Sequence, residues 1–91
     1  MVRDSAVPEL SRFFGIVIGM FYDEHGPPHF HARYGEYKIS MEIGTRAAVG
    51  RFPPRALVLV EDWARLHELE LLANWRRARA GEPLEHIAPM E

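Results

Sequence analysis

The sequence contains no cysteine, and this absence excludes both disulfide bonds and thiolate metal sites. No apolar run approaches the roughly 18 residues of a membrane span, and the first residues lack the apolar segment of a secretory signal. We therefore expect a cytoplasmic protein without a membrane partner. Excess positive charge is also missing, because the formal net charge is −2. This charge argues against nucleic-acid binding through bulk charge but leaves a local basic patch open.

A chain of 91 residues corresponds to one domain with a modest core, small enough for a partner or a homo-oligomer to add stability. Its composition divides it into three parts. We predict a flexible lead-in over residues 1–10, a single α+β domain over residues 11–81 and an extended C-terminal tail over residues 82–91. The tail contains two prolines and has room to fold back on the body of the domain.

Residues 12–22 (RFFGIVIGMFY) are mostly β-branched or aromatic and almost uncharged, which predicts a strand whose two faces are both largely apolar. Gly15 and Gly19 share one of these faces, where they would allow a bulge or the close approach of a ligand or another chain. Such a strand is typical of the centre of a sheet or of a subunit interface.

Residues 25–38 predict a β-hairpin that carries two alternate histidines. Pro27 and Pro28 have no backbone N–H, so a strand can begin only at about His29. Gly35-Glu36 suits a two-residue type II′ turn, which requires positive φ at its first central position. This turn predicts six cross-strand pairs: His29–Glu42, Phe30–Met41, His31–Ser40, Ala32–Ile39, Arg33–Lys38 and Tyr34–Tyr37.

This register separates the hairpin into an apolar and a polar face, as the period of two in a strand requires. The apolar face contains Phe30, Ala32, Tyr34, Tyr37, Ile39, Met41 and Ile43. The polar face contains His29, His31, Arg33, Lys38, Ser40 and Glu42. We expect the polar face to lie on the surface or in a groove.

The second half of the chain predicts a turn over residues 44–46, a short antiparallel strand over 47–52 and a long helix over 55–79 that ends at Gly81. The inward stripe of the helix contains Leu57, Val60, Ala64, His67, Leu71, Trp75 and Ala78. The predicted fold is α+β, with an antiparallel meander of three to four strands covered on one face by one long C-terminal helix.

A metal site is the most specific chemical hypothesis. His29 and His31 share one strand face and can converge on an ion, with His25 or Asp23 from the preceding loop as a third ligand. Imidazole with carboxylate suits Zn²⁺, Ni²⁺ or Fe²⁺. Two simpler alternatives remain open: a cross-strand ion pair between His29 and Glu42, or hydrogen-bonded surface histidines that define the turn.

A second hypothesis is acid–base catalysis on RNA. His29 or His31 would transfer the proton, while Arg33 and Lys38 would hold phosphate. The predicted register places both hairpin tyrosines on the opposite face, so no stacking platform accompanies the histidines, and we favour nucleic acid less as a partner. On the helix, His67 is expected to be a hydrogen-bonded core histidine.

Three runs of this sequence carry a resemblance to a known family: RFFGIVIGMFYDEHGPPHFHARYGEY, PPRALVLVEDW and LLANWRRARAGEPLEHIAPME. The chain resembles, over residues 11–91, the small bacterial proteins grouped as domain of unknown function 4160, whose hallmark is the PPHFH motif, here residues 27–31. The resemblance implies a protein partner in operons of toxin–antitoxin appearance. It defines no catalytic residues, so none is transferred to this chain.

Together these observations favour a bacterial protein that forms one half of a toxin–antitoxin-like or regulatory pair and uses the hairpin of residues 25–38 as its working surface. The alternative is a histidine-centred metal-binding protein or an RNase-like nuclease. Its candidate catalytic residues are His29, His31 and Arg33. Its candidate ligands for Zn²⁺ or another divalent metal are Asp23, His25, His29 and His31.

Overall fold

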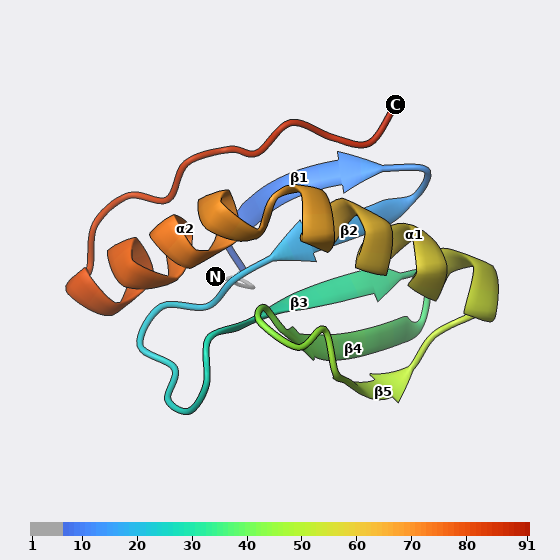
Figure 1. Ribbon diagram of the computed structural model, residues 1–91, viewed down its shortest axis with the longest axis horizontal. Helices are drawn as coiled ribbons and strands as arrows, with labels where there is room; N and C mark the ends of the chain where they lie inside the picture. Colours follow the sequence, from blue (N-terminus) through green and yellow to red (C-terminus); the bar gives the residue numbers. More distant parts are fainter. Residues whose placement is uncertain (1–6) are drawn as a thin grey trace, which may run out of the picture.

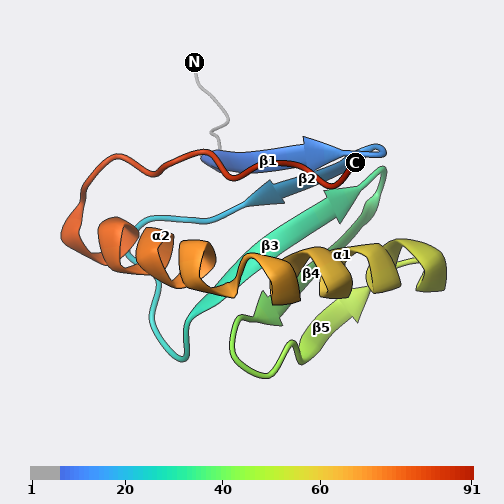
Figure 2. The ribbon, with the colours of Figure 1, turned by 45° about the horizontal axis from the view of Figure 1, so that its top comes forward.

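The computed structural model describes residues 7–91 as a five-stranded antiparallel sheet with two helices on one face (Figures 1 and 2). The strands lie side by side in chain order: β1 (Glu9–Phe13), β2 (Ile16–Gly19), β3 (His29–Tyr34), β4 (Tyr37–Glu42) and β5 (Ala48–Arg51). The helices are α1 (Pro54–Leu66) and α2 (Glu68–Ala80). The α+β class and the antiparallel meander are confirmed, whereas the sheet has one strand more than predicted and the helical segment is divided.

The additional strand arises because the first apolar run is a hairpin and not one strand. The chain reverses at Phe14 and Gly15, whose φ angles are +51° and +82°, and β1 then pairs antiparallel with β2. Positive φ at both central residues is the geometry of a type I′ turn. A phenylalanine rarely adopts such a φ, so residue preference alone did not reveal this turn.

Strand β1 begins inside the predicted lead-in. Glu9 and Leu10 belong to β1, and Leu10 is fully buried, so the prediction of a flexible segment is wrong for these two residues. The burial of an apolar side chain against the sheet provides the physical reason. Residues 1–6 of the predicted lead-in lie outside the described part of the chain.

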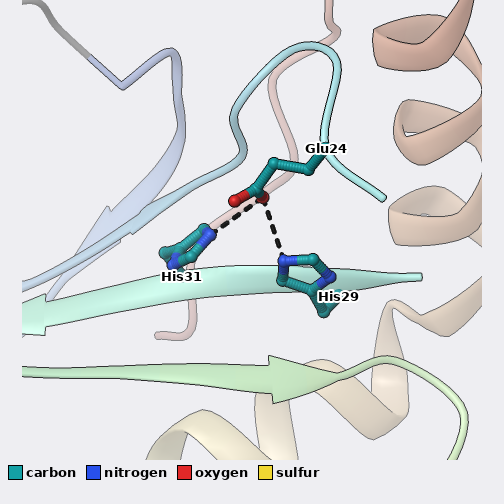
Figure 3. Close-up of side chains that lie close together, drawn as sticks. All are labelled: Glu24, His29 and His31. Carbon is teal, nitrogen blue, oxygen red and sulfur yellow. Dashed lines mark hydrogen bonds and ion pairs between the residues drawn. The ribbon is translucent and has the colours of Figure 1, made fainter. Parts of the chain in front are cut away.

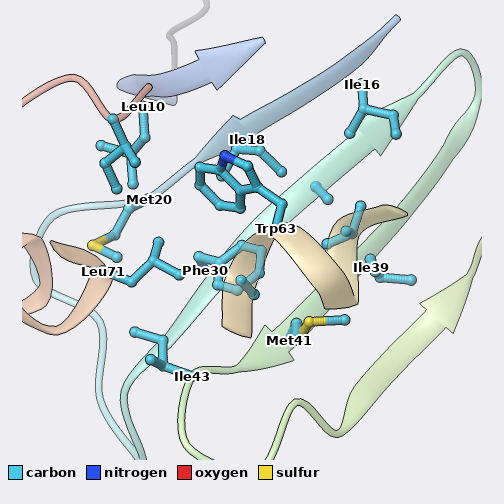
Figure 4. Packing of buried hydrophobic residues seen from close by; sticks show 14 of the residues in the cluster. Leu10, Ile16, Ile18, Met20, Phe30, Ile39, Met41, Ile43, Trp63 and Leu71 are labelled. Atoms are coloured by element: carbon cyan, nitrogen blue, oxygen red, sulfur yellow. The ribbon is translucent and has the colours of Figure 1, made fainter. Parts of the chain in front are cut away.

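The hairpin of β3 and β4 has the predicted register in all six pairs. Gly35 has a φ of +58°, as a type II′ turn requires at that position. The apolar face of the hairpin lies in a continuous core (Figure 4), although the two tyrosines at its tip remain more than a third exposed. Trp63 of α1 is fully buried in this core, with its ring centroid 5.4 Å from that of Phe13 and 6.2 Å from that of Phe30.

The predicted single helix is interrupted at His67, whose φ and ψ are −114° and 26°. The imidazole of His67 bonds to the carboxylate of Glu70, three residues later in the chain. Its ring centroid lies 5.2 Å from that of Trp63. The N-terminus of α2 has no side-chain cap, and the pairing of His67 with Glu70 is a contact between two side chains across its first turn. No glycine or proline marks this break, while Gly81 ends α2 with a φ of +72° as predicted.

The C-terminal tail has no helix or strand, as predicted, but it is part of the core. Ile87 is 1% exposed, and its N–H donates to the carbonyl of Leu10 in β1 at 2.9 Å. The indole N–H of Trp63 donates to the carbonyl of Ala88 at 2.9 Å. The buried amide of Asn74 donates to the carbonyl of Glu85 and accepts from its N–H, at 2.9 and 2.8 Å. The folded unit therefore extends beyond the predicted boundaries of residues 11–81.

Neither helix in the described residues has the length and hydrophobicity needed to cross a membrane.

Candidate functional site

The loop between β2 and β3 places a carboxylate above the first residues of β3 (Figure 3). Two residues of this loop, Asp23 and Gly26, have positive φ, at +66° and +94°, and reverse its direction. Strand β3 then begins at His29, directly after the two prolines, as predicted. The reversal brings Glu24 over the polar face of β3.

Glu24, His29 and His31 form the cluster that this arrangement creates. One carboxylate oxygen of Glu24, Oε1, lies 2.9 Å from Nε2 of His29 and 3.0 Å from Nε2 of His31. The side chains are only 29%, 18% and 29% exposed, respectively. The candidate ligand atoms of all three residues lie within 4.8 Å of one another.

The hydrogen bond of Nδ1, the other ring nitrogen of His29, indicates which nitrogen of the ring carries the proton. Nδ1 lies 3.0 Å from the carbonyl oxygen of Pro27, and because a carbonyl can only accept, Nδ1 carries a proton. In the neutral ring, Nε2 then presents a lone pair to Glu24. Because Nδ1 already donates, His29 can donate to Glu24 only as the doubly protonated ring, whereas in the neutral ring the Nε2 lone pair is available to a cation. A histidine that donates one N–H to a backbone carbonyl is typical of metal ligands.

Aromatic side chains hold both imidazoles in place. The indole of Trp75, from α2, lies 5.1 Å from the ring of His29, and the ring of Phe21 lies edge-on to His31 at 4.8 Å. The two imidazoles are 5.2 Å apart and nearly perpendicular. These contacts limit ring rotation, so the two Nε2 atoms are oriented before any ligand binds.

Of the predicted ligands, the structure brings His29 and His31 together and leaves Asp23 and His25 exposed, outside the cluster. The carboxylate comes from Glu24, which sequence reasoning missed. Strand periodicity predicted the two histidines, whereas a loop has no period that separates one acidic residue from its neighbour. The only available signal was the position of Glu24 next to a predicted ligand.

Two further residues of the polar hairpin face lie apart from the cluster. Arg33, a predicted catalytic candidate, lies on the same face of β3 but points into solvent. Glu42 lies opposite His29 in the register, but its carboxylate accepts a hydrogen bond from the hydroxyl of Thr45 at 2.9 Å, while His29 pairs with Glu24. The expected alternative of a cross-strand ion pair is therefore not what holds His29.

Two imidazole nitrogens and one carboxylate oxygen can hold Zn²⁺, Ni²⁺ or Fe²⁺. Three protein ligands leave at least one coordination position for water or another molecule, as in catalytic rather than structural zinc sites. Without a metal, the Glu24 carboxylate can accept a hydrogen bond from an imidazole N–H of this cluster.

Comparison with known proteins places this cluster inside a recognised family region. Residues 15–76 match the model of a family described as a domain of unknown function, DUF4160. This segment runs from the turn before β2 into α2 and includes Glu24, His29 and His31. No curated protein and no solved structure matches the chain. Because the match covers more than half of the sequence, the chain belongs to the DUF4160 family.

Proposed function

We propose that the protein binds one divalent metal ion through Glu24, His29 and His31. The observation that supports this proposal is the hydrogen bond from Nδ1 of His29 to the carbonyl of Pro27, which directs the Nε2 lone pair at the Glu24 carboxylate. A bound cation would satisfy that lone pair together with Nε2 of His31 and the carboxylate.

The spacing of the three groups is compatible with this role. Ligand atoms at tetrahedral zinc lie about 2.0–2.1 Å from the metal and therefore roughly 3.3 Å from one another. The oxygen-to-nitrogen distances of 2.9 and 3.0 Å are close to this value, and all three candidate ligand atoms lie within 4.8 Å of one another. Because Glu24 belongs to a loop, its carboxylate can move to accommodate an ion.

Zinc titration of the metal-free protein, followed through the histidine ring signals by NMR, tests the metal proposal. We expect the His29 and His31 signals to shift together and to saturate at about one equivalent, as a three-ligand site requires. The His25→Asn variant serves as control, because this exposed loop residue lies outside the cluster, and it should bind zinc like the parent protein. Independent titration of His29 and His31, with no response to zinc, contradicts the proposal.

A second proposal is that the protein docks onto a protein partner in the cytoplasm, as one half of a toxin–antitoxin-like or regulatory pair, through the exposed surface at the helix break instead of the hairpin of residues 25–38 expected from the sequence. Two leucines on either side of the helix break support it: Leu66 is 75% and Leu69 is 80% exposed. Val58 of α1 is also 52% exposed. Large apolar side chains on a helical surface favour contact with another protein over contact with water.

The partner proposal predicts that tagged protein isolated from its native cells carries one other protein in equimolar amount. The Leu66→Ser/Leu69→Ser variant should recover at least about tenfold less of it, because burial of each leucine contributes about 1.5–3 kcal/mol. The Glu24→Gln variant is the matched control and should recover the partner unchanged. Isolation of the chain alone, or equal recovery by both variants, contradicts docking through these leucines.

A further inference from the structure

One residue from each strand forms a row across the sheet face that points away from the helices. The register aligns Arg12 of β1, Val17 of β2, Arg33 of β3, Lys38 of β4 and Arg51 of β5. The row points outward, because buried residues neighbour its first four members along the strands: Ser11, Phe13, Ile16, Ile18, Ala32 and Ile39. Its four basic members are all exposed, and we call them the basic row.

Three members of the basic row are available to a ligand. Arg12 is engaged, because its guanidinium bonds to the carboxylate of Glu9 at 2.9 Å, and this bond holds the pKa of Glu9 below its ordinary value. Within residues 7–91, Arg33, Lys38 and Arg51 form no ion pair. The last two of these side chains, with Glu36 and Tyr37, line a surface hollow of about 430 Å³.

The spacing of these three cations suits a linear polyanion. Neighbouring strands are about 4.8 Å apart, so the Cα atoms of Arg33, Lys38 and Arg51 span about 10 Å in single file. Guanidinium groups bind phosphate through two parallel hydrogen bonds, which favours a phosphate-bearing ligand. The row contains a single apolar residue, Val17, whereas the centre of a protein–protein interface is depleted of charge.

We propose that the basic row binds the phosphodiester backbone of a single-stranded nucleic acid. Phe14, in the turn between β1 and β2 at the adjacent end of the sheet, is 59% exposed and can stack on an unpaired base, whereas the side chains of Tyr34 and Tyr37 belong to the opposite face. His31 precedes Arg33 by two residues on the same face of β3. The cluster that contains His31 therefore lies about 7 Å along β3 from the row. A strand bound to the row therefore passes beside Glu24, His29 and His31.

Binding of a fluorescein-labelled oligouridylate, measured by fluorescence anisotropy at low salt with EDTA, tests this proposal. The Arg33→Gln/Lys38→Gln/Arg51→Gln variant should bind at least about tenfold more weakly, and the slope of log affinity against log salt should fall by about 2, since each phosphate contact contributes about 0.7. The charge-matched control, Arg65→Gln/Arg76→Gln/Arg79→Gln, removes three exposed helix arginines and should stay within about twofold of the parent protein.

Three results would overturn the proposal. One is an equal loss of affinity in the two variants, each shown to be folded by circular dichroism. No binding of the oligonucleotide by the parent protein would overturn it as well. The third is displacement of the oligonucleotide by polyglutamate as readily as by polyuridylate, which would indicate an acidic protein as the ligand. EDTA removes metal from every sample, so the outcome is independent of whether the cluster binds zinc.

Discussion

Deletion of residues 83–91 is expected to lower the free energy of unfolding by about 5 kcal/mol. The tail buries Ile87 and supplies backbone partners to Trp63 and Asn74. Burial of the isoleucine contributes about 2–3 kcal/mol, and each hydrogen bond about 1 kcal/mol net. The loss of about 5 kcal/mol is comparable with the whole stability of roughly 5–14 kcal/mol expected for a domain of this size.

Urea unfolding followed by tryptophan fluorescence measures this effect, because Trp63 contacts the tail directly. Ile87→Ala should retain the fold but lose about 2–5 kcal/mol, as for other large-to-small core substitutions. His86→Ala is the neighbouring control, and its side chain is exposed, so its midpoint should change by less than about 0.5 kcal/mol. A truncated chain with the midpoint of the parent protein would show that the tail does not stabilise the core.

The Glu24→Gln variant is expected to bind zinc at least about 100-fold more weakly than the parent protein. Glutamine keeps the size of the side chain but removes the anionic oxygen that faces both Nε2 atoms. Loss even of groups that only orient metal ligands typically costs 10–100-fold in affinity, so loss of a ligand should cost more. Isothermal titration calorimetry of the metal-free proteins gives this ratio directly.

Asp23→Asn is the matched control for the zinc measurement. It removes the same charge one residue away, from an exposed side chain that lies outside the cluster, and should change the affinity by less than about threefold. Equal affinities for the parent protein and Glu24→Gln would identify a different ligand set. Equal losses in both acidic variants would indicate a general effect of loop charge instead of coordination by Glu24.

Elements defined by local signals were predictable from the sequence. The start of β3 follows from two prolines, and the register of the hairpin follows from Gly35, because a two-residue turn leaves only one pairing. That register also predicted that His29 and His31 share the polar face. The end of α2 at Gly81 has the same local origin.

Features that depend on tertiary context were not predictable. The turn at Phe14 forms although this residue disfavours positive φ, since pairing of β1 with β2 outweighs local preference. The helix is interrupted at His67, where no glycine or proline gives a local signal for the break. Glu24 joins the cluster through the path of a loop, and loop paths are not periodic.

The tail also makes the two edges of the sheet different in how many of their backbone groups are paired. It runs along β1 in both views and bonds to Leu10, while β5, in the described part of the chain, pairs only with β4 (Figures 1 and 2). Edge strands with unpaired N–H and C=O groups are where the sheets of separate molecules can join. The bond from Ile87 to Leu10 satisfies one backbone carbonyl at the β1 edge, so the C-terminal residues leave β1 with fewer free backbone groups for pairing with another chain.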